Sequence, residues 1–149
     1  RYWLGTPVAT ASALIPLQIA GGLGFLVFVA CVTGCVGNTV PTRGILSYGN
    51  GFVCTATVAI FLAASSAWPF ATQRYLDLTP DARAWSDAAG PVAALVAAAL
   101  SAIVMVAGAF EGDMHPAAIC GVLVFAMVVV LADGVGWNSM LILKHPNGR

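Results

Sequence analysis

Long runs of apolar residues, each closed by charged residues, divide this chain into four parts. The longest uncharged runs, of 41, 30, 23 and 19 residues, lie between Arg1 and Arg43, Arg43 and Arg74, Asp87 and Glu111, and Asp113 and Asp133. A helix needs about 20 apolar residues to cross about 30 Å of hydrocarbon. The pattern therefore predicts four membrane-spanning segments, which we place at about 14–36, 46–70, 88–110 and 116–137.

These runs are continuously apolar and do not alternate between apolar and polar positions, which favours helices over the strands of a barrel. A helix also satisfies its own backbone hydrogen bonds in lipid, where water is absent. The first run is too long for the apolar region of a signal peptide, so we expect it to remain as a span. The sequence thus predicts an all-α, integral membrane four-helix bundle. Residues 1–149 form its single domain, with short outer loops and a longer inner loop.

The composition excludes several classes of protein. Hydrophobic residues make up 60% of the 149 residues and charged residues only 8%, with formal net charge zero. A soluble domain carries about 25% charged residues, so this inventory cannot build a water-exposed surface. Phosphate neutralisation requires clustered Lys and Arg, which argues against nucleic acid as a partner. A disordered chain would be much less hydrophobic.

The loops carry an asymmetry of basic residues that predicts the orientation. With four spans, one side has only Arg43, whereas the side holding both termini has Arg1, Arg74, Arg83, Lys144 and Arg149. Basic residues favour the cytoplasmic side, so we expect a multi-pass protein with both termini on the cytoplasmic or equivalent side. The tryptophans support this layout because all four fall at predicted inner boundaries: Trp3, Trp68, Trp85 and Trp137.

Small residues within the spans are candidates for helix packing. Helices associate in lipid through close backbone approach, which Gly and Ala permit. The candidate positions are Gly21 and Gly24 in the first span, Ala93 and Ala97 in the third, and Gly121 in the fourth. They are explained either by packing within the bundle or by an outward face for a partner.

Asp133 is the acid that lies within an apolar stretch. Acids inside a membrane are costly and often serve a partner or a pathway, which makes Asp133 a candidate partner position. The interpretation that we favour is an acid near the inner interface that reaches water or pairs with Arg74, Arg83 or Lys144.

Four cysteines are predicted in the outer half of the bilayer: Cys31, Cys35, Cys54 and Cys120. An outer-side disulfide, for example between Cys35 and Cys120, is compatible with an oxidising compartment. The alternative is that all four are small apolar packing residues.

The densest polar segment is Glu111-Gly112-Asp113-Met114-His115. Two acids and an imidazole could hold a metal ion, but a tight turn between helices also needs glycine and polar residues. The chain contains no phosphate-binding loop, dinucleotide fingerprint, zinc-protease motif or nucleophile elbow in a fitting context. We therefore predict no enzyme activity, no cofactor and no metal site.

The layout and several short segments resemble the MARVEL-domain tetraspan family, which includes the MAL, plasmolipin and chemokine-like-factor transmembrane proteins. The similar segments are Leu17-Gln18, Trp85-Ser86-Asp87, Ser101–Val104, Ala118–Phe125 and Ala132-Asp133. The architecture covers about residues 14–143. The resemblance implies a non-enzymatic role in membrane organisation, vesicle traffic or stabilisation of a partner. Lipids, other membrane proteins or further copies of the chain would be its partners.

An alternative function is that of a small accessory subunit in a large respiratory or photosynthetic membrane complex. Such a subunit would also lack catalytic motifs and would present faces of small residues. A pore-forming oligomer fits less well, because no predicted span carries a polar stripe.

Overall fold

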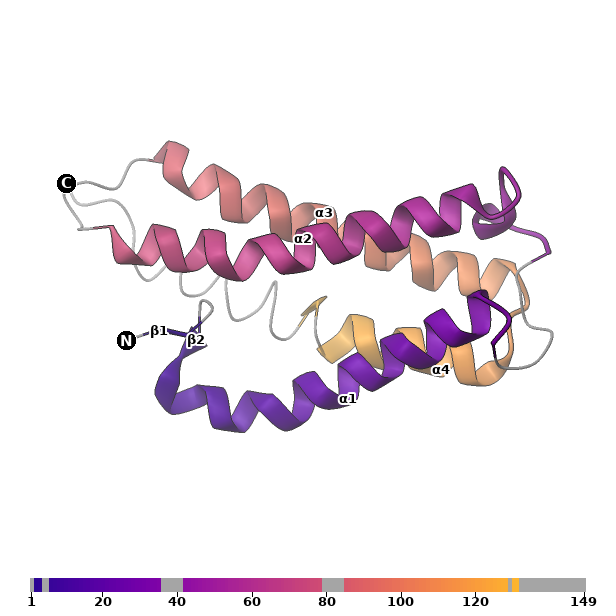
Figure 1. Ribbon diagram of the computed structural model, residues 1–149, viewed down its shortest axis with the longest axis horizontal. Coiled ribbons are helices and arrows are strands. Elements are labelled where there is room, and N and C mark those ends of the chain that lie inside the picture. The colour runs from indigo at the N-terminus through magenta and orange to yellow at the C-terminus, as the bar shows by residue number, and fades with distance from the viewer. Residues whose placement is uncertain (1, 4–5, 36–41, 79–84, 129, 132–149) are drawn as a thin grey trace.

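The computed structural model describes residues 2–3, 6–35, 42–78, 85–128 and 130–131. The described part is helical apart from two strands of two residues each, which pair antiparallel with Tyr2 opposite Pro7. The elements in chain order are β1 (Tyr2–Trp3), β2 (Thr6–Pro7), α1 (Val8–Val32), the 3-10 helix η1 (Ile45–Ser47), α2 (Phe52–Asp77), α3 (Trp85–Glu111) and α4 (Pro116–Phe125) (Figure 1).

Three of the helices, α1, α2 and α3, are long and apolar enough to cross a membrane. This confirms the prediction of long apolar helices and indicates a membrane protein. The fourth apolar helix is shorter and covers Pro116–Val128. Its last turns widen to π-helical geometry at 126–128 and 130–131. The rest of the span that we predicted at 116–137 lies outside the described residues, as does Asp133.

The second helix begins later than the sequence pattern predicts. Residues 46–51 were expected inside a span, but they form η1 and a turn. Backbone φ is positive at Gly49 (61°), Asn50 (57°) and Gly51 (85°). The left-handed region cannot continue a right-handed helix, so this glycine-rich segment delays the start of α2 to Phe52.

The same helix also ends later than predicted, at Asp77 instead of near residue 70. Thr72, Tyr75 and Leu76 are buried, so packing extends the helix through residues that we had placed in the inner loop. Trp68 therefore lies well inside α2 and is only 3% exposed. Its ring is part of the hydrophobic core, and our placement of Trp68 at a headgroup boundary stays a prediction.

The helices form two antiparallel pairs. α1 packs mainly on α4, and α2 packs mainly on α3, with a smaller contact between α3 and α4. Figure 1 shows the start of α1, the end of α2 and the start of α3 at one end of the bundle. The end of α1, η1 and the turn between α3 and α4 lie at the other end, which we call the η1 end.

Two glycines bring the backbones of α1 and α4 into contact. A Cβ placed on Gly24 would lie 2.5 Å from the carbonyl oxygen of Gly121, and a Cβ on Gly121 would lie 2.5 Å from the carbonyl oxygen of Gly24. Real Cβ atoms essentially never approach so closely. The pair therefore depends on the absence of a side chain at both positions, as is typical of close helix packing in lipid.

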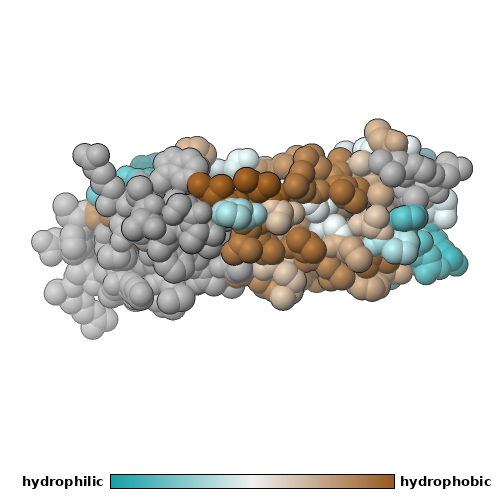
Figure 2. Space-filling model, turned by 90° about the horizontal axis from the view of Figure 1, so that it is seen from below, coloured by the Kyte–Doolittle hydropathy of each residue, from teal (hydrophilic) through white to brown (hydrophobic). Residues whose placement is uncertain are grey.

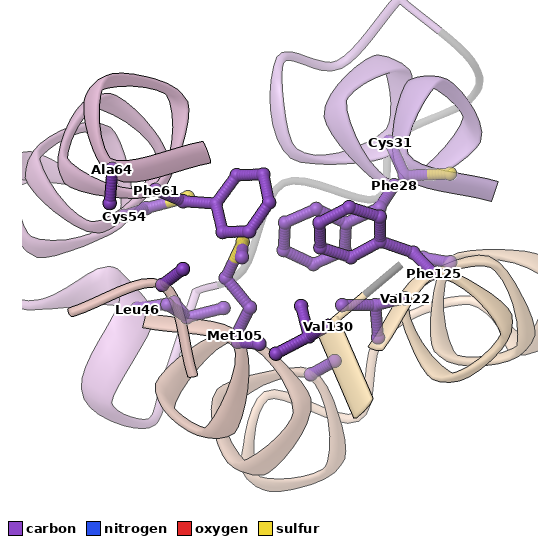
Figure 3. Close-up of a cluster of buried hydrophobic side chains, with 14 of the residues drawn as sticks. Phe28, Cys31, Leu46, Cys54, Phe61, Ala64, Met105, Val122, Phe125 and Val130 are labelled. Carbon is purple, nitrogen blue, oxygen red and sulfur yellow. The ribbon is translucent and has the colours of Figure 1, made fainter. Parts of the chain in front are cut away.

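Large side chains from α2 and small ones from α3 supply much of the remaining core. Phe61 and Trp68 of α2 are 3% exposed, and Ala98 and Ala102 of α3 are 0% and 2% exposed. Figure 3 shows Phe61, Phe28 and Phe125 converging on the centre from three different helices. The ring centroids of Phe61 and Phe125 are 4.6 Å apart with edge-to-face geometry, which is favourable for aromatic pairs.

The outer surface of the bundle is strongly apolar. Leu23, Leu26, Leu100 and Ile103 are each more than half exposed, and Figure 2 shows a broad apolar band with a hydrophilic patch at one end. A soluble monomer rarely exposes such a continuous apolar surface. Hydrocarbon is the medium that these side chains suit.

Candidate functional site: a polar clasp and an interhelical groove

A polar clasp ties the segment before α2 to the turn between α3 and α4. The guanidinium of Arg43 forms an ion pair with the carboxylate of Asp113. The backbone N–H of Ile45 donates a hydrogen bond of 3.1 Å to Oε2 of Glu111. We call these four residues the clasp. It joins residues that are 66 to 70 positions apart in the chain and so fixes where η1 lies.

Next to the clasp, η1 makes an apolar contact with α3. Leu46 is 0% exposed, and its side chain covers Gly108 so closely that no Cβ would fit there without displacing it. Gly44 has φ of 78°, and a Cβ at that position would lie 2.9 Å from Cβ of Glu111. Glycine at 44 and 108 thus lets η1 dock against the end of α3.

His115 begins the last helix. Its Nδ1 accepts a hydrogen bond of 3.2 Å from the backbone N–H of Ala117, so the imidazole is the N-cap of α4. Pro116 follows at the first helical position, where its missing N–H costs nothing. Asp113 in the preceding turn has φ of 47°.

The polar groups of residues 111–115 therefore hold a turn together. Among the residues that the structure describes, no group of three or more His, Cys, Asp or Glu side chains could hold a metal ion. The geometry supports the interpretation of this segment as a turn.

A groove opens between α1 and α2 beside η1, with a cavity volume of about 810 Å³. Deeper in the bundle the ring of Phe25 from α1 meets the ring of Phe61 from α2, with centroids 5.5 Å apart. The groove is lined by Val29, Val32, Thr33, Thr42, Leu46, Ser47, Asn50, Gly51, Cys54, Thr55, Val58, Ala59 and Leu62. Its apolar part is formed mainly by valine and leucine, and its polar part lies near η1.

Three hydroxyl groups in the polar part of the groove share one arrangement. Oγ1 of Thr33 donates to the carbonyl oxygen of Val29 at 2.8 Å. In the same way, Oγ of Ser47 donates to Gly44 at 2.8 Å, and Oγ1 of Thr55 donates to Gly51 at 3.1 Å. A hydroxyl has one proton and two lone pairs, so each oxygen remains a hydrogen-bond acceptor.

The four cysteines do not form a disulfide in the structure, where all are free thiols. Cys31 and Cys54 are buried, and Cys54 also lines the groove. Cys35 and Cys120 are exposed. The two buried cysteines match the packing role that we gave as the alternative to an outer-side disulfide.

The predicted packing positions fall into different environments. Gly24 and Gly121 meet each other, and Gly21 is buried. Ala97 is half-buried, whereas Ala93 is exposed. The stripe of α3 that enters the core is the neighbouring one, which contains Ala98 and Ala102.

Sequence reasoning missed the clasp and the contact between Leu46 and Gly108. The signals were a lone basic residue, Arg43, on the side that also carries Glu111 and Asp113, and a glycine at the end of an otherwise alanine-rich helix. Neither signal indicates which residue is in contact with it, because the contacting residues lie in different elements of the chain.

Comparison with known proteins gives no match: no family model fits the chain, and no curated protein or solved structure is similar to it.

Proposed function

We propose that this protein is a non-enzymatic tetraspan that organises the membrane by packing laterally against lipids and partner membrane proteins. The observation that carries this proposal is the groove between α1 and α2, which combines an apolar wall with an uncharged polar rim. A site of this kind suits an amphiphilic occupant better than a water-soluble one. The exposed apolar side chains of α1, α2 and α3 supply a wider lateral surface.

The proposal includes a fourth span that continues beyond α4 and both termini on the cytoplasmic side. The excess of basic residues on the side of the termini supports that orientation. The resemblance of Trp85-Ser86-Asp87 and Ala118–Phe125 to MARVEL-domain proteins supports the role in membrane organisation.

A second candidate function is that of an accessory subunit in a larger membrane complex, respiratory or photosynthetic. The observation that favours it is the exposed stripe of Ala89 and Ala93 on α3, which the bundle itself leaves uncovered. Small residues let a partner helix approach closely. Val92 and Val96 beside the stripe are also exposed and would widen such a contact.

Extraction in a mild detergent, followed by size-exclusion chromatography and mass spectrometry, separates the two functions. An organiser elutes alone, as a homo-oligomer or with vesicle proteins. Recovery in a fixed ratio with the subunits of a membrane enzyme would reject the organiser and establish the accessory subunit.

A reporter fused after Arg149 tests the orientation independently. We expect the reporter to resist protease added to intact cells. Cleavage would place the C-terminus on the outside and reject the proposed topology.

A further inference from the structure

We propose that the groove between α1 and α2 binds a ceramide-class lipid, with its head at the rim near η1 and a hydrocarbon chain along the apolar wall. The inference rests on the proposed function, because it names the lipid that the same groove would select. The volume of the groove, about 810 Å³, lies within the range of about 300–1,000 Å³ that is usual for binding sites of small ligands.

The position of the groove points to a lipid. It lies between two helices that are apolar enough to cross a membrane, and the lining residue Leu62 is 48% exposed on the side of α2. Val29, Val32 and Val58 form the apolar wall. Hydrocarbon is the medium around such helices, so a lipid chain reaches this wall without crossing water.

The charge of the rim points to a neutral head. Among the residues that the structure describes, none that lines the groove carries a charge. Arg43 follows the lining residue Thr42, but its guanidinium is held by Asp113 in the clasp. A phosphate head would require cationic partners, which Arg and Lys usually supply.

The hydrogen bonding of the rim points to a head with several donors. The hydroxyls of Thr33, Ser47 and Thr55 each donate to their own backbone and are left as acceptors. A ceramide offers two hydroxyl groups and one amide N–H, which is one donor for each acceptor. The side-chain amide of Asn50 carries donors of its own and suits the amide carbonyl of the lipid. A sterol or a diacylglycerol offers a single donor.

The test is photo-crosslinking of the purified full-length protein in phosphatidylcholine vesicles, using a ceramide with a diazirine in its acyl chain and an alkyne for detection. We expect crosslinked peptides from the groove walls on α1 and α2. Unlabelled ceramide should compete about tenfold better than a diacylglycerol or a sterol, since two fewer hydrogen bonds are worth roughly that factor. Crosslinks outside the groove, or equal competition by all three lipids, would overturn the assignment.

Two sets of variants locate the effect. Ala59→Trp fills the groove and should reduce labelling about tenfold, whereas Ala107→Trp places the same side chain on an exposed position of α3 and should leave labelling unchanged. Circular dichroism establishes that each variant is folded. Equal labelling of folded Ala59→Trp and wild type would reject the site.

The double variant Ser47→Ala, Thr55→Val removes two rim acceptors at almost constant volume, so it tests the head without filling the groove. It should erase the preference for ceramide over diacylglycerol. Ser65 does not line the groove, and its hydroxyl donates to the backbone carbonyl of Leu62, so Ser65→Ala should keep that preference. A preference that survives in the double variant would contradict the role of the rim.

The lipid assignment and the proposed function fail separately. Recovery of the chain as a subunit of a membrane enzyme would reject the organiser but leave ceramide labelling in place. Loss of ceramide selectivity in a protein that still purifies alone would reject only the lipid assignment.

Discussion

The interface between α1 and α4 and the interface between α2 and α3 differ in the contacts that hold them together. At the first, Gly24 and Gly121 bring two backbones into direct contact. At the second, Trp68 on α2 shares the buried core with alanines such as Ala98 on α3. At the glycine pair the first interface has no room for a methyl group, although the rings of Phe25 and Phe125 also meet across it with centroids 4.8 Å apart. The second combines a large side chain with small ones.

Both kinds of helix packing follow from the lipid that surrounds the helices. Lipid chains are as apolar as leucine, so burying an apolar side chain between helices gains little unless the fit is closer than lipid provides. A glycine pair achieves a close fit because the two backbones come close together. A large aromatic side chain achieves it by packing against small residues. The groove lies between α1 and α2 near η1, where neither kind of packing is present.

The largest expected effect is on the interface that depends on large side chains. Trp68→Ala would leave a cavity in the core, because Trp68 is 3% exposed. Such truncations cost about 3–5 kcal/mol in water, and we expect the lower end because lipid replaces water as the reference. Unfolding in sodium dodecyl sulfate, followed by circular dichroism, measures the change.

Phe70→Ala is the matched control for this truncation, because Phe70 belongs to the same helix and is 65% exposed. It should change the free energy of unfolding by much less than Trp68→Ala. Equal losses for the two variants would show that Trp68 does not hold the α2–α3 pair in the way described.

A smaller loss is expected at the glycine interface. Gly24→Ala would push a methyl group into the carbonyl oxygen of Gly121, and overpacking of this kind costs about 1–3 kcal/mol. Gly22→Ala has no atom within 4 Å of the new Cβ and should stabilise the helix by about 0.5–1 kcal/mol. The same unfolding assay compares them. A Gly24→Ala protein as stable as Gly22→Ala would rule out the backbone contact.

The smallest effect is expected at the clasp. The side chains of Arg43 and Asp113 are 70% and 71% exposed, so water and salt screen their ion pair. A double-mutant cycle with Arg43→Gln and Asp113→Asn should give a coupling energy of about 0.2–1 kcal/mol that falls as salt is added. A coupling that is absent at low salt would mean that the hydrogen bond from Ile45 to Glu111 and the docking of Leu46 position η1 without this ion pair.

The fold was predictable from sequence to the level of apolar helices. The long uncharged runs located α1, α2 and α3, because the width of a bilayer sets the length of a spanning helix. The ends of α2 were not predictable. Its start depends on positive φ values at Gly49, Asn50 and Gly51, and its end depends on the burial of Tyr75.

The site was predictable only in fragments. The sequence marked Gly24 and Gly121 as packing positions, but it did not pair them with each other. It drew attention to Glu111 and Asp113, but it did not indicate that Arg43 and Ile45 are their partners. The groove was not predicted, because its two walls come from different helices and its polar rim depends on where η1 docks.

The sequence by itself determined that the chain forms long apolar helices suited to a membrane, because hydropathy and helix length depend only on residues close together in the chain. The tertiary structure decided which helices pair, which of two alanine stripes on α3 is buried, and where the bundle opens into a groove. Those outcomes depend on the rotation of each helix about its axis. In lipid, a few close contacts such as Gly24 with Gly121 and Leu46 with Gly108 set that rotation.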